Sequence, residues 1–123
     1  MPERPILVVD DDPTILATVS EVLDMEGFAV VTATNGAEAL AAVDHAVPSL
    51  VLLDMRMPVL DGWGVARALR QRGHELPIIV MTAAQNARGW ANEIGAATYL
   101  AKPFEDTQLL AAVERYRSKP PEA

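Results

Sequence analysis

Short apolar runs alternate along this chain with longer segments in which apolar residues recur every three or four positions. The runs contain four to six residues and are rich in Val, Ile and Leu. Continuous runs of this kind are typical of strands buried on both faces of a sheet. The pattern predicts strands over residues 6–9, 28–33, 50–53, 78–81 and 98–101. The second run is less uniformly apolar, which favours a position nearer the edge of the sheet.

The segments between the runs predict five helices, because their apolar residues recur with the period of an α-helix. These helices are expected over residues 13–26, 35–45, 61–72, 85–94 and 105–119. Gly27 and Gly73 follow two of them and provide stop signals. The helix at 85–94 has the weakest pattern, because Gly89 interrupts it and only Trp90 and Ile94 are bulky.

Five alternations of strand and helix imply a parallel sheet with helices on both faces. We therefore predict an α/β fold with a doubly wound, flavodoxin-like sheet of five parallel strands in the order 2-1-3-4-5. The chain has 123 residues, which suits a single domain. We expect residues 1–117 to form this domain and residues 118–123 to form a disordered tail or the start of a linker.

Composition narrows the chemistry available to this domain. Lys and Arg number 10 against 17 Asp and Glu, so the formal net charge is −7. An acidic domain repels phosphate backbones, which argues against direct binding of nucleic acid. The chain has no Cys and two His, which excludes thiolate sites and an all-histidine metal cage. A metal would be held mainly by oxygen, which favours hard cations such as Mg2+.

The sequence shows no sign of membrane targeting. No apolar run approaches the roughly 20 residues that span a bilayer. The first residues pass directly into the apolar run at 6–9 and lack the features of a signal peptide. We therefore expect no membrane contact and a cytoplasmic location.

Polar side chains stand where the predicted strands end. Asp10 and Asp11 follow the first strand, and Asp54 follows the third. Thr82 and Lys102 come directly after the fourth and fifth strands. In an open parallel sheet, ligands bind beyond the carboxyl ends of the strands, where the strand order reverses. That point lies between the first and third strands, so we expect these side chains to converge there.

Three carboxylates at one edge repel one another, by about 4 kcal/mol for two charges ~4 Å apart at an effective dielectric near 20. Lys102 supplies one compensating charge, and an octahedral Mg2+ that retains some water fits the remainder. Asp54 lies on the predicted central strand, so we expect it to be the most enclosed of the three. With Mg2+ and Lys102 beside it, the Asp54 carboxylate can attack an activated phosphorus while Thr82 donates a hydrogen bond.

With these residues in place, the sequence resembles the receiver domain of two-component response regulators. The resemblance covers about residues 5–117. It rests on five motifs in matching order and spacing, namely Ile6–Asp11, Asp54–Pro58, Asp61–Gly62, Val80–Ala83 and Tyr99–Phe104. Any one of them alone would be weak, whereas five together are highly specific. The resemblance implies a phosphorylation-switched signalling receiver and not an enzyme, although the domain assists its own phosphorylation and dephosphorylation.

The resemblance implies that Asp54 accepts a phosphoryl group from a histidine kinase phosphohistidine or from a phosphotransfer protein. It also implies that Asp10, Asp54 and the backbone carbonyl of Arg56 ligate Mg2+, with Asp11 acting largely through water. An effector domain or a partner protein would respond to the switch, and the domain would act as a monomer or a homodimer.

The resemblance further implies that Lys102 binds the phosphoryl group, that the Lys102–Pro103 bond is cis, and that Thr82 and Tyr99 form the switch pair. The interval from Thr82 to Lys102 is slightly shorter than the family pattern, and the shortening falls on the weak helix at 85–94. That helix belongs to the family's usual output surface, so the shortening argues against a conventional dimer or partner contact there.

Three further residues lie close in sequence to these motifs and have separate interpretations. Asp12 precedes Pro13 and is interpreted as the N-cap of the first helix. Trp63 is assigned to packing, although its position in the sequence makes it a fluorescence reporter of the site. For Arg56, control of water access to the phosphoryl group and plain solvent exposure are both left open.

Two other functions stay open from the sequence. A constitutive interaction module would keep the fold without the switch, and the unusual region around Gly89 and Trp90 motivates this interpretation. A small phosphohydrolase that uses an aspartyl-phosphate is the second. Such enzymes usually carry another carboxylate two residues after the nucleophile, where this chain has Arg56, which argues against repeated turnover on external substrates.

Overall fold

The predicted strands form one parallel sheet in the computed structural model, which describes residues 4–83 and 85–117. Within that part of the chain the strands are β1 (Ile6–Val9), β2 (Val30–Ala33), β3 (Leu50–Asp54), β4 (Ile78–Thr82) and β5 (Thr98–Ala101). Their order is β2-β1-β3-β4-β5, which confirms the prediction. The order reverses between β1 and β3, and β2 lies at an edge, as its weaker apolar pattern indicated.

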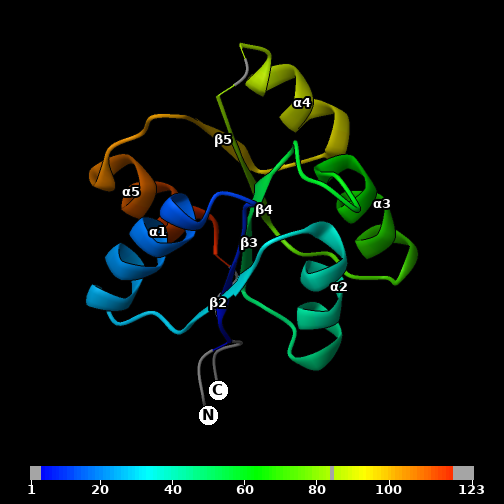
Figure 1. Cartoon of the computed structure of the whole chain (residues 1–123), viewed down its shortest axis with the longest axis horizontal. Coiled ribbons are helices and arrows are strands. Elements are labelled where there is room, and N and C mark those ends of the chain that lie inside the picture. Colours follow the sequence, from blue (N-terminus) through cyan, green and yellow to red (C-terminus); the bar gives the residue numbers. More distant parts are fainter. Residues whose placement is uncertain (1–3, 84, 118–123) are drawn as a thin grey trace.

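Helices cover both faces of this sheet (Figure 1). α1 (Pro13–Met25) and α5 (Asp106–Tyr116) pack on one face. α2 (Gly36–His45), α3 (Gly62–Gln71) and α4 (Ala87–Ile94) pack on the other. Among the described residues, no helix is both long enough and apolar enough to cross a bilayer.

Strand residues alternate between the two faces and supply two apolar cores. In β1, Ile6 and Val8 face α1 and α5, whereas Leu7 and Val9 face the other three helices. Every residue of β1, β3 and β4 is buried, which explains the unbroken apolar runs that these strands form in the sequence. The packing of these three central strands on both faces therefore holds their carboxyl ends in fixed positions.

Most predicted boundaries agree closely with the observed ones. α1 begins at Pro13 because the Asp12 side chain accepts a hydrogen bond from the Thr14 backbone N–H at 2.9 Å, as its interpretation as an N-cap required. The strand predicted at 28–33 begins later, at Val30, although Phe28 is buried in the core beside α1 and α5. The last helix, predicted to end at residue 119, ends at Tyr116, because the next residue, Arg117, has an extended backbone. The expected tail at 118–123 lies outside the described residues.

Helix α4, the weakest in the sequence pattern, is the shortest helix of the described chain, with 8 residues. It begins at Ala87 and not at Gln85. Its N-cap, Asn86, makes no side-chain capping hydrogen bond. At its other end Gly95 adopts φ 69°, the left-handed conformation that commonly closes a helix.

Candidate functional site

Three carboxylates meet at the carboxyl edge of the sheet. Asp10 follows β1, Asp54 is the last residue of β3, and Asp11 lies in the connection to α1. A carboxylate oxygen from each lies within 4.8 Å of those from the other two. The register of β1 and β3 pairs Val9 with Leu53, so the two strands end side by side. The structure thus brings together the three side chains that the sequence places at this edge.

Lys102 brings an ammonium group to the cluster from the end of β5. Its backbone N–H donates to the Thr82 carbonyl at 2.9 Å, which continues the pairing of β4 with β5. Its Nζ lies 2.5 Å from Asp10 Oδ2 and 3.9 Å from Asp54 Oδ1. The Lys102–Pro103 peptide bond is cis, as the resemblance implied. Lys102 therefore pairs mainly with Asp10 and stands at a longer distance from Asp54.

Asp10, and not Asp54, is the most enclosed of the three carboxylates, so that expectation was wrong. Asp10 is 0% exposed, Asp54 is 6% exposed, and Asp11 is exposed. The Asp10 backbone N–H donates to the Ala33 carbonyl at 3.1 Å, which extends the pairing of β1 with β2 beyond the strand end. Lys102 then covers the Asp10 carboxylate, whereas the Asp54 side chain lies at the wall of a cavity.

The surroundings of Asp54 make its charged form less favourable than that of a free carboxyl group. Burial, and then the neighbouring Asp10 carboxylate, raise the pKa of Asp54 to about 6, and Asp11 adds to the rise. Lys102 and the Arg56 backbone N–H, which lies 3.5 Å from Asp54 Oδ1, lower the pKa but do not offset this rise. The cluster thus carries more negative charge than Lys102 neutralises. Its oxygen donors fit a hard divalent cation, which Asp10, Asp11 and Asp54 could hold.

A cavity of about 620 Å³ lies beside Asp54. Thr82, the last residue of β4, is buried and lines this cavity together with Asp54 and Lys102. A hydroxyl at this place can donate to an anion bound at Asp54. Tyr99 is half-buried on β5 opposite Val80 and packs against the core under α2, α3 and α4. Thr82 is one of the described residues that line the cavity, whereas Tyr99 is not.

The connection from β4 to α4, together with α4 itself, supplies cavity residues that the sequence did not assign to the site. These are Ala83, Gln85, Asn86 and Trp90. From the sequence, Trp90 was interpreted only as a bulky side chain in a helix with a weak pattern. Its one usable signal was its place shortly after the strand that ends in Thr82. Arg56 also lines the cavity, although its side chain is exposed.

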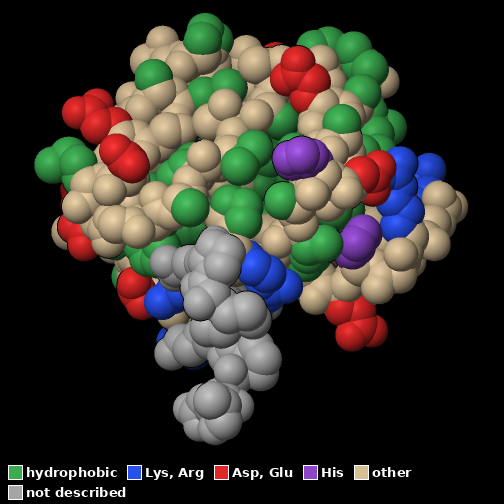
Figure 2. Space-filling view, turned by 90° about the horizontal axis from the view of Figure 1, so that it is seen from below, with side chains coloured by type: hydrophobic (Ala, Val, Ile, Leu, Met, Phe, Trp, Pro, Cys, Tyr) green, Lys and Arg blue, Asp and Glu red, His purple; other side chains and the backbone are tan. Residues whose placement is uncertain are grey.

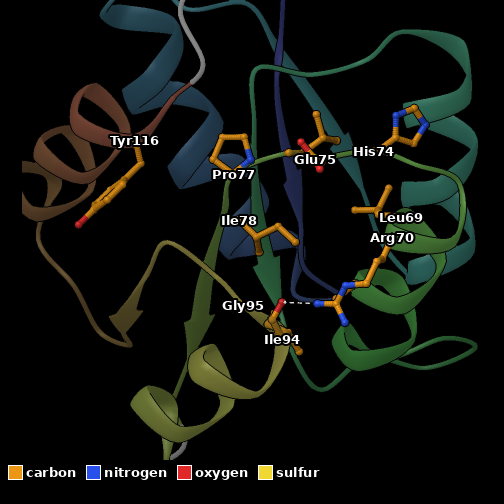
Figure 3. A pocket seen from close by; sticks show the side chains of 11 residues that line it. Leu69, Arg70, His74, Glu75, Pro77, Ile78, Ile94, Gly95 and Tyr116 are labelled. Carbon is orange, nitrogen blue, oxygen red and sulfur yellow. Dashed lines mark hydrogen bonds between the residues drawn. The ribbon is translucent and has the colours of Figure 1, made fainter.

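A second cavity, of about 640 Å³, lies where α3 leads into β4 and α4 ends (Figure 3). Arg70 donates a hydrogen bond to the Ile94 carbonyl at 3.2 Å there, and His74 and Glu75 line the same cavity. Figure 2 views the molecule from the end at which the chain starts, and the acidic side chains visible there are scattered. A hard cation needs several oxygen ligands, and Glu75 is the sole acidic residue among the described lining of this second cavity. The three carboxylates at the carboxyl edge of the sheet therefore make that edge the candidate site.

Comparison with known sequences agrees with this geometry. The family described as the response regulator receiver domain matches residues 6–114. The transcriptional regulatory protein PrrA of Mycobacterium tuberculosis is 42% identical over 111 residues, which are 89% of this chain and 48% of that protein. The transcriptional regulatory protein CpxR of Klebsiella pneumoniae is 44% identical over 110 residues, which are 88% and 47% of the two proteins. The chain spans about half the length of these curated relatives.

Solved structures share the fold. The chemotaxis protein CheY4 of Vibrio cholerae superimposes with a TM-score of 0.85 at 31% identity, over 94% of this chain and 99% of that one. The receiver domain of NtrX from Brucella abortus gives a TM-score of 0.83 at 33% identity, over 89% and 95% of the two chains. The family match over most of the sequence, the strand order and these likenesses agree, and the chain belongs to the receiver domains of two-component response regulators.

Proposed function

We propose that Asp54 is the phosphoacceptor of this receiver domain, and that its donor is the phosphohistidine of a histidine kinase or of a phosphotransfer protein. Receiver domains of response regulators interact with histidine kinases, which supports a donor of this class. The observation that carries the proposal is the place of Asp54, nearly buried beside two further carboxylates and 3.9 Å from the Lys102 ammonium. This arrangement exposes one carboxylate to the cavity where a phosphoryl group would sit.

Asp10, Asp11 and Asp54, with the backbone carbonyl of Arg56, are the proposed ligands of Mg2+, and Asp11 acts largely through water. The three carboxylate oxygens and the negative charge that Lys102 leaves uncompensated support this choice. Bound there, Mg2+ would keep Asp54 ionised and neutralise charge on the phosphoryl oxygens.

In the proposed transfer, an Asp54 carboxylate oxygen attacks phosphorus while the P–N bond of the phosphohistidine breaks. The electrons of that bond return to the imidazole, which takes up a proton from solvent, and Asp54 becomes an acyl phosphate. Lys102 and the Thr82 hydroxyl stabilise the phosphoryl oxygens. In dephosphorylation, water attacks the phosphorus in line, inorganic phosphate leaves, and the carboxylate is restored. The domain assists both steps on itself and does not turn over an external substrate.

Thr82 and Tyr99 are the proposed switch pair. Thr82 moves toward the phosphoryl oxygens and vacates space that Tyr99 then occupies. The two packings differ by roughly a few kcal/mol, so the phosphoryl group biases an existing equilibrium. The half-buried position of Tyr99, away from the cavity, supports its assignment as the part of the pair that responds to Thr82.

The output is proposed to be an effector domain or a partner protein. The matched relatives are transcriptional regulators of which this chain covers about half. The receiver itself, with a net charge of −7, is not expected to contact DNA. A regulator of transcription works beside the chromosome, which favours a cytoplasmic location. We propose that the domain acts there as a monomer or a homodimer.

Acetyl phosphate with Mg2+ tests the phosphoacceptor. The wild-type protein is expected to gain the mass of one phosphoryl group, and the Asp54→Asn variant is expected to gain none. Asp12→Asn is the matched control, because Asp12 caps α1 and Asn caps a helix about equally well. Equal labelling of the wild type and of Asp54→Asn overturns the assignment.

An interaction module without a switch is the alternative, which the short α4 without a side-chain cap favours. Millimolar Mg2+ with beryllofluoride, which mimics a phosphoryl group, separates the two functions. A receiver that switches shows changes in tryptophan fluorescence and in NMR chemical shifts, whereas a module without the switch shows neither. A phosphohydrolase is disfavoured because Arg56 stands where a second carboxylate would be needed.

A further inference from the structure

An arginine and two tryptophans form a connected group beside the proposed phosphoacceptor. The Arg56 guanidinium carbon lies 5.1 Å from the centre of the Trp90 ring. The Trp90 and Trp63 rings meet edge to face, with 4.8 Å between their centroids. Trp63 Nε1 donates a hydrogen bond to Glu93 Oε2 at 2.8 Å. The group therefore joins the segment after β3 to helices α3 and α4.

Arg56 and Trp90 also line the cavity beside Asp54. Among the described residues that line this cavity, Lys102 and Arg56 are the two cations. With a volume of about 620 Å³, the cavity leaves room for a side chain on its wall to move. Because the Arg56 side chain is exposed, its guanidinium can turn from one partner to another without disturbing the core.

Once Asp54 is phosphorylated, the charges at the site favour a further cation besides Mg2+ and Lys102. Lys102 Nζ lies closer to Asp10, at 2.5 Å, than to Asp54, at 3.9 Å, so its charge is already shared. A phosphoryl group carries more negative charge than the carboxylate to which it is added. A guanidinium binds phosphoryl oxygens through parallel, charge-assisted hydrogen bonds, which are stronger than an exposed cation–π contact. A move of Arg56 from Trp90 to the phosphoryl oxygens would therefore exchange a weaker partner for a stronger one.

We propose that Arg56 is, after Lys102, the second cationic side chain that binds the phosphoryl group. It is held on the face of Trp90 until Asp54 is phosphorylated and then moves to the phosphoryl oxygens. The proposal rests on the proposed function of Asp54 as the phosphoacceptor. Departure of the guanidinium changes the environment of the Trp90 ring and its contact with Trp63. Because Trp90 belongs to α4, the exchange couples the charge at Asp54 to that helix.

Fluorescence of a single tryptophan tests the exchange. The chain has two tryptophans, so Trp63→Phe leaves Trp90 as the only tryptophan while an aromatic ring stays beside it. In this background, beryllofluoride is titrated at saturating Mg2+. The Trp90 emission is expected to change as beryllofluoride binds. Adding Arg56→Met is expected to weaken the apparent affinity about three- to tenfold and to reduce the emission change by at least about half.

One further variant separates the guanidinium of Arg56 from its charge, and another controls for the change in net charge. Arg56→Lys keeps the charge but not the planar fork, so its affinity for beryllofluoride is expected to lie between that of the parent protein and that of Arg56→Met. Arg88→Met is the matched control, because Arg88 is exposed on the same helix as Trp90 and is not among the residues that line the cavity. It makes the same change in net charge and is expected to leave both readouts as in the parent protein.

Equal affinity and equal emission change for Arg56→Met and Arg88→Met overturn the proposal. Weaker binding with an undiminished emission change also overturns it, because the guanidinium would then bind the mimic without leaving Trp90. Labelling by acetyl phosphate distinguishes these results from a failure at Asp54. If the wild type is labelled and Arg56 has no effect, only the role of Arg56 falls. If the wild type is not labelled, the phosphoacceptor assignment falls first.

Discussion

The Lys102 ammonium lies 2.5 Å from Asp10 but 3.9 Å from Asp54, so its closest partner is the carboxylate with no exposed surface. Removing the cation leaves the Asp10 charge buried and unpaired, which is strongly destabilising. We expect Lys102→Met to lower the free energy of unfolding by about 2–4 kcal/mol without Mg2+. Urea denaturation in the presence of a chelator measures the loss.

The double variant Asp10→Asn with Lys102→Met provides the internal control for this prediction. It removes both charges, so it is expected to recover most of the stability that Lys102→Met loses. Arg72→Met provides the external control, because Arg72 pairs with Asp44 at 2.6 Å on the surface. An exposed pair contributes about 1 kcal/mol or less. A loss in Lys102→Met no larger than that in Arg72→Met would contradict the importance of burial.

The raised pKa of Asp54 makes stability depend on pH. The pKa rises from 3.8 to about 6 in the folded chain, so between these values the folded state binds more protons than the unfolded state. The free energy of unfolding therefore falls as the pH rises through this window. Asp54→Asn has no such titrating proton. Without Mg2+, its free energy of unfolding is therefore expected to exceed that of the wild type by about 1–3 kcal/mol at pH 7.

Denaturation curves from pH 3.5 to pH 7, in chelator, measure this difference. It is expected to shrink towards zero near the acid end, where Asp54 is mostly neutral in both states. Mg2+ favours the ionised carboxylate and is expected to narrow the difference at pH 7. A difference between Asp54→Asn and the wild type that stays constant over this range would show that burial of a charge is not its source.

Mg2+ binding is expected to require Asp10 and not its neighbour Asp12. Asp10 contributes to the carboxylate cluster, whereas the Asp12 side chain accepts the Thr14 N–H as the cap of α1. Asp10→Asn removes a charged ligand and is expected to weaken Mg2+ about tenfold or more, while Asp12→Asn leaves it within about twofold. Titration calorimetry compares the two variants, and similar losses in both would mean that general acidity, and not the cluster, attracts the cation.

The centre of the sheet was predictable because complete burial of β1, β3 and β4 leaves an unbroken apolar run in the sequence. Helix α4 was harder to predict because much of its packing comes from small or distant partners. Ala87 and Ala91 are buried but leave no bulky periodic signal, and Trp90 packs on Trp63 of another helix. Tertiary contacts of this kind stabilise a helix that its own propensity does not favour.

The carboxylate cluster could be predicted because this strand order brings the ends of β1 and β3 together. The relative burial of Asp10 and Asp54 could not, since it depends on which carboxylate Lys102 covers. The contact of Arg56 with Trp90 likewise depends on side-chain rotamers in two separate segments. Periodicity reports which face a residue occupies, but not which partner a long side chain selects.

Two glycines beside the site are expected to respond in opposite ways to alanine. A Cβ at Gly62 would lie 2.8 Å from Met55 Cα, next to the end of β3, so backbone must move. A Cβ at Gly89 would meet the side-chain end of Asn86, which makes no capping hydrogen bond and can turn away. Gly62→Ala is therefore expected to destabilise the fold by about 1–3 kcal/mol, and Gly89→Ala to stabilise it by about 0.5–1 kcal/mol.

Thermal and urea unfolding of the two alanine variants, followed by circular dichroism, measure these changes. The Gly62 substitution also displaces the segment that carries Asp54, so it is expected to weaken Mg2+ binding as well. The Gly89 substitution acts on α4 alone and is expected to leave Mg2+ affinity unchanged. If Gly89→Ala is destabilising instead, the Asn86 side chain is held in place by the fold, and the weak start of α4 is a constrained feature of the site and not a tolerated one.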